Sequence, residues 1–145
     1  MKYVYLLEFV SNIRRLQKEM YDDISREIKM NSTSIEILSF LYDNPEKNTA
    51  LDVCSLKNMK PSLVSFHVEK LVLAGYLSRE SVAGDRRKVG LKVTEKAREV
   101  VARCHAAREA VLSDFLSECS EDELDTVREL IVRLNKKSQK ILNKK

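Results

Sequence analysis

The most chemically distinctive segment is Asp85-Arg86-Arg87-Lys88, in which three consecutive cations follow an aspartate. Residues 76–82 and 88–93 favour two β-strands, and the glycine-containing segment 83–87 favours the turn between them. Three adjacent cations are costly to bury, so we expect Arg86, Arg87 and Lys88 to face solvent or a polyanion. An arginine at a hairpin tip can enter a narrow DNA minor groove. Asp85 is expected to orient an arginine, because a carboxylate repels phosphate.

A second candidate segment lies just before the hairpin. Pro61 suits the first turn of a helix and Gly75 suits a helix C-terminus, so residues 61–73 are predicted to form a helix. Its outer face is expected to enter the major groove of DNA, which admits one helix. There, serine hydroxyls can bind phosphates or base edges, and Leu63 or Phe66 can contact a thymine methyl group. Packing of these two residues against the first helix or the hairpin is the alternative. The candidate DNA-binding residues of this segment are Lys60, Ser62, Leu63, Ser65, Phe66 and Lys70.

The elements that must position these residues are mostly helices. The 145 residues include only 3 Gly and 2 Pro, which excludes a sandwich or barrel of many short strands. Apolar residues recur every three or four positions along residues 3–28, which predicts a long first helix. A Thr33–Glu36 capping box predicts a second helix that ends before Asn44-Pro45, and Thr49 is expected to cap a short third helix over 49–56.

Helices are also expected after the hairpin. Thr94 is predicted to cap one long helix, and a Ser120–Glu123 capping box is predicted to open the last. The fold is therefore expected to be mainly α with a small β-hairpin, a winged helix-turn-helix with long N- and C-terminal dimerisation helices. We expect residues 31–93 to form the winged helix-turn-helix DNA-binding domain. Residues 1–30 and 94–145 are expected to form a helical dimerisation region within one integrated fold.

Charge is unevenly distributed along the chain. The formal net charge is +4, yet ten cations and only four anions lie between Lys57 and Arg98, so the remainder of the chain is slightly acidic. A solvated face explains such a cluster if it is taken alone. Beside a predicted helix and hairpin that suit DNA, it indicates a surface that binds a polyanion.

The segment Gly84–Ala97, GDRRKVGLKVTEKA, resembles the wing signature D-x-R…L-x-L-T-x-x-G of the MarR family of bacterial transcription regulators. The signature residues present here are Asp85, Arg87, Leu91 and Thr94. Lys60–Glu80 is similar to the recognition helix of that family and its exit into the wing, and the resemblance covers essentially the whole chain. Two positions depart from the family pattern: Ala97 replaces a glycine, and Phe66 stands where an arginine or polar residue is common.

The resemblance implies a homodimer that binds a pseudo-palindromic operator on double-stranded DNA. It also implies a repressor of transcription that a small molecule or an oxidant releases. A small aromatic or phenolic effector would bind between the dimer helices and the winged domain, with Tyr5, Phe9 and Phe115 as candidate lining residues. Core packing is the alternative role for each of the three. Peroxide-sensing relatives use a cysteine in the first helix, and here that helix has none.

Residues for catalysis or metal binding are sparse. The chain has two histidines and no C-x-x-C, H-E-x-x-H, glycine-rich phosphate loop or paired-carboxylate signature, so we predict neither an enzyme nor a cofactor. His67 falls near the buried stripe of its helix, where a packing role is expected. A metal site on Cys104, His105 and Cys119 is disfavoured, because neighbouring residues point to different helix faces and denser ligand clusters are usual.

The remaining signals concern the compartment. Three cysteines at unpatterned spacings favour reduced thiols in the cytoplasm. No apolar run approaches the roughly 18 residues that a membrane span needs, and the N-terminus lacks a signal-peptide cleavage site. The competing hypothesis is a winged-helix module that binds protein, which would not need three cations at the hairpin tip. A salt titration of binding to random DNA distinguishes the two, because a DNA-binding protein loses affinity steeply as salt rises.

Overall fold

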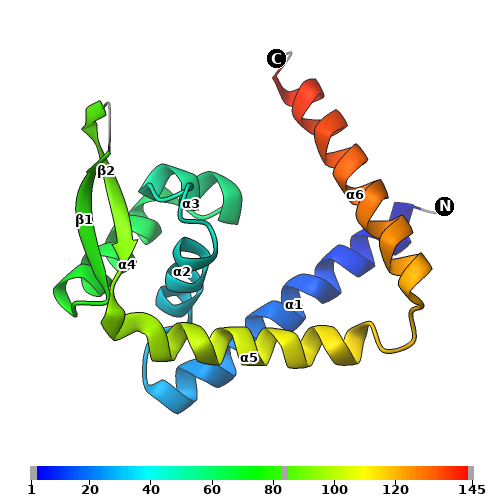
Figure 1. The fold of residues 1–145 in the computed structure, drawn as a ribbon, viewed down its shortest axis with the longest axis horizontal. Helices are drawn as coiled ribbons and strands as arrows, with labels where there is room; N and C mark the ends of the chain where they lie inside the picture. The colour runs from blue at the N-terminus through cyan, green and yellow to red at the C-terminus, as the bar shows by residue number, and fades with distance from the viewer. Residues whose placement is uncertain (1–2, 83–84, 144–145) are drawn as a thin grey trace. The chain divides into compact units, whose positions relative to one another are not determined.

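The computed structural model describes residues 3–82 and 85–143, without the side chains of residues 82 and 85–87. Its helices and strands are α1 (Tyr3–Ile28), α2 (Ser32–Asp43), α3 (Ala50–Lys57), α4 (Pro61–Leu73), β1 (Leu77–Val82), β2 (Asp85–Val93), the 3₁₀ turn η1 (Glu95–Ala97), α5 (Arg98–Phe115) and α6 (Glu121–Leu142) (Figure 1). The predicted fold class, mainly helical with one small hairpin, is confirmed. The chain divides into two compact units, Met1–Arg108 and Glu109–Lys145.

Two helices begin with a capping box: the Ser120–Glu123 box was predicted, and the predicted N-cap Thr49 forms a box with Asp52 as well. At the start of α3, the Asp52 amide donates to Thr49 Oγ1 at 3.1 Å, and the Thr49 amide donates to the Asp52 carboxylate at 3.0 Å. Ser120 and Glu123 form the same reciprocal pair at the start of α6. Each box satisfies amide groups that the first turn of a helix would otherwise leave unpaired.

The predicted capping box at the start of α2 is wrong. Asn31 is the N-cap, and its side-chain oxygen accepts a hydrogen bond from the Thr33 amide at 2.9 Å. Asparagine is at least as good an N-cap as threonine, and the N-cap lies two residues earlier than predicted. The Glu36 carboxylate instead forms an ion pair with Lys57 of α3, at 2.6 Å.

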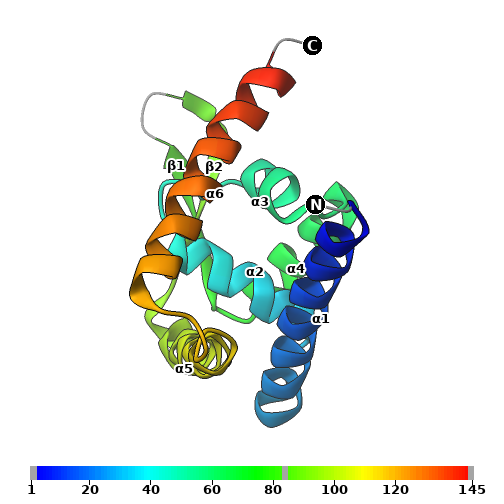
Figure 2. The same ribbon diagram turned by 90° about the vertical axis from the view of Figure 1, so that its right-hand side faces the viewer.

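The core of the first unit is built around α2, which contacts α1, α3, α4 and β2 (Figure 2). Ile35, Ile37 and Leu38 of this helix are completely buried. Only the C-terminal half of α1 joins this core, whereas the apolar residues of its N-terminal half are exposed in the single chain. The remaining buried apolar residues of the cluster are Met20, Tyr21, Ile24, Leu41, Val53, Val64, Val68, Leu71, Leu77, Leu91, Ala97, Val100, Val101 and Cys104.

The hairpin begins its second strand earlier than the sequence predicts. Pairing runs from Leu77 opposite Val93 to Val82 opposite Asp85, with an irregularity between residues 81 and 82. β2 therefore starts at Asp85 rather than at residue 88, because Asp85 pairs with Val82 beyond this irregularity. The predicted hairpin itself is confirmed.

The junction after the hairpin also differs from expectation. Thr94 stands at the start of the 3₁₀ turn η1 and makes no side-chain capping bond, and α5 begins only at Arg98. The Thr94 hydroxyl instead donates a hydrogen bond to the carbonyl oxygen of Gly75, at 2.7 Å. The predicted capping role of Thr94 is therefore wrong, since its hydroxyl serves the end of α4.

In the second unit, the large apolar residues along one side of α6 are exposed to solvent in the single chain. Within the described residues 109–143, no residue is buried in the single chain. The exposed large apolar residues of α6 are Val127, Leu130, Ile131, Val132, Leu134, Ile141 and Leu142. An amphipathic helix of this kind requires a partner surface to cover its apolar face.

Candidate nucleic-acid interface

Helix α4 has one face fixed in the core of the first unit. Val64, Val68 and Leu71 are buried on that face. His67 is buried beside them, and its Nδ1 lies 2.8 Å from the Ser34 hydroxyl of α2. Burial lowers the pKa of His67, and the nearby charge of Lys70 lowers it further. The expected packing role of His67 is confirmed, and α4 is held so that its opposite face is open to solvent.

The open face of α4 combines apolar and polar side chains. Leu63 is 41% exposed and Phe66 is 54% exposed, so neither packs in the core. Lys70 Nζ lies 4.4 Å from the centre of the Phe66 ring, and the ring meets His67 edge-on at a centroid distance of 5.2 Å. All six candidates of this segment are exposed, namely Lys60, Ser62, Leu63, Ser65, Phe66 and Lys70.

An ion pair connects this helix to the first strand of the hairpin. Arg79 of β1 contacts the Glu69 carboxylate of α4 at 2.5 Å. Both side chains are about half exposed, so the pair adds little stability by itself. The pair matters for geometry, because it holds the Glu69 carboxylate of the open face against β1.

The hairpin tip contains the other candidate residues. The side chains of Asp85, Arg86 and Arg87 lie outside the described part of the structure, so their roles stay predictions. Lys88 is exposed. The pKa of Asp52 in α3 is lowered mainly by its hydrogen bond with Thr49, and the charge of Lys88 contributes to this shift. Lys88 therefore lies on the side of the hairpin that faces Asp52.

The C-terminus of α4 is held by the segment that leads into α5. Lys96 Nζ donates to the Ala74 carbonyl oxygen at 2.7 Å and lies 4.7 Å from the centre of the Tyr76 ring. Thr94 donates to the adjacent carbonyl oxygen, that of Gly75, whose φ of +79° is one that glycine adopts at low cost. We call Thr94 and Lys96 the helix-end clamp. The role of Lys96 was not predictable from the sequence, because no local pattern links residues 22 positions apart.

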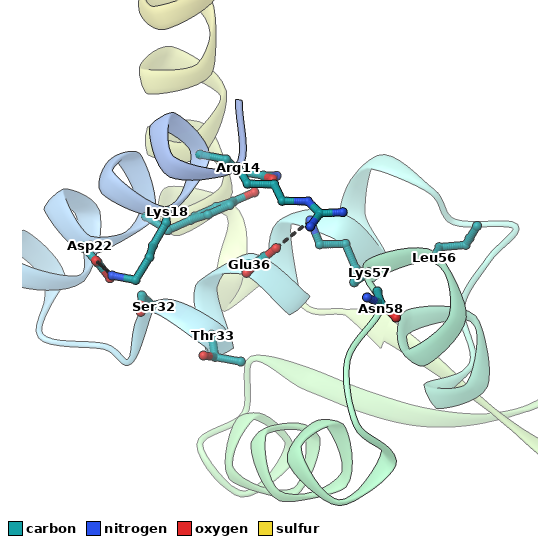
Figure 3. A pocket seen from close by; sticks show the side chains of 11 residues that line it. Arg14, Lys18, Asp22, Ser32, Thr33, Glu36, Leu56, Lys57 and Asn58 are labelled. Carbon is teal, nitrogen blue, oxygen red and sulfur yellow. Dashed lines mark hydrogen bonds and ion pairs between the residues drawn. The ribbon is translucent and has the colours of Figure 1, made fainter. Parts of the chain in front are cut away.

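A pocket of about 560 Å³ opens between α1, α2 and α3 (Figure 3). The ion pair of Glu36 and Lys57 forms one wall, and Lys18 is paired with Asp22 at 2.5 Å. Figure 3 shows Arg14 reaching from α1 across the pocket toward Glu36 and Lys57. The lining residues are Arg14, Gln17, Lys18, Tyr21, Asp22, Ser32, Thr33, Glu36, Leu56, Lys57 and Asn58.

The three predicted effector residues do not line this pocket. Tyr5 and Phe9 are exposed on α1 in the single chain, and Phe115 is exposed on α5 in the second unit. Their role as a binding site stays a prediction. The pocket is lined mostly by polar residues of α1, α2 and α3. These residues come together only when the three helices pack, so their spacing in the sequence does not indicate a pocket.

A polar cluster between α2 and α5 was also not predicted from the sequence. The Asp43 carboxylate lies 2.6 Å from His105 Nε2 and 2.6 Å from an Arg108 guanidinium nitrogen. Arg108 also donates to the Ser39 hydroxyl at 2.9 Å, and Tyr42 contacts the His105 ring edge-on. These hydrogen bonds and ion pairs hold α2 and α5 together.

The cysteines show no arrangement for chemistry. Burial raises the pKa of Cys104, which keeps that thiol protonated and unreactive. Cys54 is partly buried and Cys119 is exposed. Across residues 3–82 and 85–143, no three His, Cys, Asp or Glu side chains are grouped so that they could hold a metal ion. Every helix in these ranges is too short or too polar to cross a lipid bilayer.

Comparison with known proteins gives two kinds of match. Residues 30–97 match a family model described as a winged helix DNA-binding domain. The chain is also 21% identical, over 143 residues, to the HTH-type transcriptional regulator TcaR of Staphylococcus aureus strain Newman. That alignment covers 97% of this chain and 93% of TcaR.

Two solved structures illustrate the similarity of fold. The transcription regulator MarR from Oenococcus oeni PSU-1 superimposes with a TM-score of 0.66 at 20% identity, over 91% of this chain and 97% of that one. The MepR–DNA complex of S. aureus superimposes with a TM-score of 0.69 at 17% identity, over 94% and 96% of the two chains. Residues 30–97, which match the model of a winged helix DNA-binding domain, contain α4 and the hairpin, so both candidate segments lie within that match.

Proposed function

Because this chain contains a winged helix DNA-binding domain and has the MarR fold that its sequence resembles, we propose that it is a sequence-specific DNA-binding transcription regulator. It binds a pseudo-palindromic operator on double-stranded DNA as a homodimer and acts as a repressor. TcaR and the MarR protein of O. oeni are transcription regulators, which favours a binding function over catalysis.

One observation carries the proposal. The open face of α4 presents hydroxyl, apolar and cationic side chains, and it stands beside a hairpin whose second strand begins with three cations in succession after Asp85. A helix with such a face fits the major groove, and the adjacent cations fit phosphates or the minor groove. Lys60, Ser62, Ser65, Lys70, Arg86, Arg87 and Lys88 are the proposed polar DNA contacts.

The test is binding of the purified chain to DNA as a function of salt. Fluorescence anisotropy with a random duplex, and with a duplex selected from a random library, should give a steep linear fall of log affinity with log salt. The selected duplex should bind at least about 10³-fold more tightly than the random one at physiological salt. Binding that is insensitive to salt would favour the alternative, a winged-helix module that binds protein.

A small-molecule effector is part of the proposal, and the pocket between α1, α2 and α3 supports it. It lies between a predicted dimerisation helix and the winged domain, where a ligand would change the angle between them. Arg14 would bind an acidic group, while Leu56 and the Tyr21 ring would cover the aromatic body of a small aromatic or phenolic acid.

Thermal unfolding in the presence of benzoate tests the pocket. A bound ligand raises the unfolding temperature by mass action, and Arg14→Gln should abolish the rise. Arg15→Gln is the matched control, since Arg15 does not line the pocket. A rise that survives Arg14→Gln, or no rise at all, would contradict benzoate binding at this pocket. We place this regulator in the bacterial cytoplasm, where its DNA would be.

A further inference from the structure

We propose that α4 recognises thymine-containing half-sites through the 5-methyl groups of the bases, which Leu63 and Phe66 contact in the major groove. This inference rests on the proposed DNA-binding function and names the base chemistry that the helix reads.

Helix α4 lacks the three residue types that bind one base most readily with two planar hydrogen bonds, namely arginine, asparagine and glutamine. Arginine binds guanine with two hydrogen bonds, and asparagine or glutamine binds adenine in the same manner. The sequence PSLVSFHVEKLVL of Pro61–Leu73 contains none of these three residue types. His67 is not a substitute, because it is buried and its Nδ1 is bonded to Ser34.

The charged groups of the open face are already engaged. Glu69, the one carboxylate of α4, is paired with Arg79 and is therefore poorly available to accept a hydrogen bond from cytosine. Lys70 lies over the Phe66 ring, where it serves as a point charge for phosphate or for one base acceptor. Two serines remain, and a hydroxyl bonds to several bases and discriminates weakly between them.

The apolar groups stand where base edges would lie. Leu63 is in the first turn of α4 and Phe66 follows one turn later on the exposed side, so both lie toward the helix N-terminus. The N-terminal residues of a recognition helix are those that contact base edges. The Phe66 ring is held by His67 at its edge and Lys70 over its face, so it is oriented before DNA arrives. The 5-methyl group of thymine is the apolar feature of the major groove.

The experiment exchanges thymine for uracil in a duplex selected by the wild-type protein. Uracil keeps the hydrogen-bonding groups of thymine and lacks only the 5-methyl group, so contacts in the minor groove are retained. Affinity should fall about 4-fold for each contacted methyl group, the factor expected from one methyl-sized apolar burial. In Leu63→Ala and in Phe66→Ala, this loss of affinity should disappear at the thymine that the replaced residue contacts. A double-mutant cycle that combines the protein variant with the uracil substitution measures this effect.

Leu73→Ala is the matched control. Leu73 is 79% exposed on the same helix and lies ten residues beyond Leu63, about 15 Å along the axis, so its variant should keep the full uracil penalty. Wild-type binding that is indifferent to uracil at every position overturns the inference alone. A penalty that persists in both Leu63→Ala and Phe66→Ala also overturns it. Absence of any DNA binding overturns the proposed function and this inference together.

Discussion

At the scale of single residues, the strongest signal is a cation cluster on the hairpin. Burying three adjacent cations would cost too much free energy, so Arg86, Arg87 and Lys88 are expected to be exposed. This expectation follows from their order in the chain alone. The open face of α4 was equally predictable, because the alternation of buried and exposed positions follows from helical periodicity. The partners of Glu36, Lys96 and Asp43 were not predictable, since each ion pair or hydrogen bond joins residues far apart in sequence.

Arg87 should be the main contributor of the hairpin to DNA affinity. Replacing it with alanine should weaken operator binding by about 1–3 kcal/mol and reduce the salt slope by roughly one. Arg87→Lys should also weaken binding, because a guanidinium sheds its hydration more easily than an ammonium does. Asp85→Ala should have a smaller effect, through misplacement of the arginine. Fluorescence anisotropy measures these losses, and operator binding as tight as wild type by Arg87→Ala would assign the hairpin a structural role only.

His67 should make stability depend on pH. Its pKa is lowered in the folded chain, first by burial, so between that value and the ordinary histidine pKa of about 6.5 the unfolded chain binds more protons. The free energy of unfolding should therefore fall as pH drops from about 6.5 toward the lower folded-state pKa, and be unaffected by His67 above that window. Urea denaturation from pH 7 to 5 measures it. His67→Gln should give a flatter profile, and identical profiles would refute this role.

At the scale of elements, most of the fold follows from local sequence. The long apolar stripes, Pro61, Gly75, the Thr49 cap and the Ser120–Glu123 capping box each identify a helix or one of its ends. Two predicted helix caps are wrong, and at each one a different hydrogen bond forms in place of the predicted one. Asn31 takes the cap that was expected of Thr33, and the Thr94 hydroxyl serves the end of α4 instead of its own helix.

The helix-end clamp of Thr94 and Lys96 should set the orientation of α4. Thr94→Val and Lys96→Met keep the size of each side chain but remove the hydrogen bond to Gly75 or Ala74, which should cost about 0.5–1.5 kcal/mol of stability each. Both variants should bind the selected operator more weakly than wild type while their affinity for random DNA stays unchanged. Anisotropy with the two duplexes measures this difference.

The conservative variants provide the control for the clamp. Thr94→Ser keeps the hydroxyl, so it should retain operator affinity. An equal loss of affinity for operator and random DNA in Thr94→Val would mean that the clamp supports the fold in general and does not orient the recognition helix.

At the scale of the whole molecule, the uncovered apolar residues of α1 and α6 predict a homodimer. A single chain would leave a large apolar surface exposed to water. Sedimentation at micromolar concentration should therefore give a species of twice the 16.7 kDa chain mass. Ile131→Glu should shift it toward monomer, whereas Lys136→Glu, on the opposite side of α6, should not. A wild-type protein that sediments only as a 16.7 kDa species would refute the dimer.

In the proposed mode of DNA binding, two copies of this chain place their α4 helices in successive major grooves of one duplex. Hydroxyl-radical footprinting on the selected duplex tests it most directly. Two protected patches related by two-fold symmetry are expected, with centres about 34 Å, or one helical turn of DNA, apart. A single asymmetric patch, or no protection at a protein concentration that saturates binding, would contradict it.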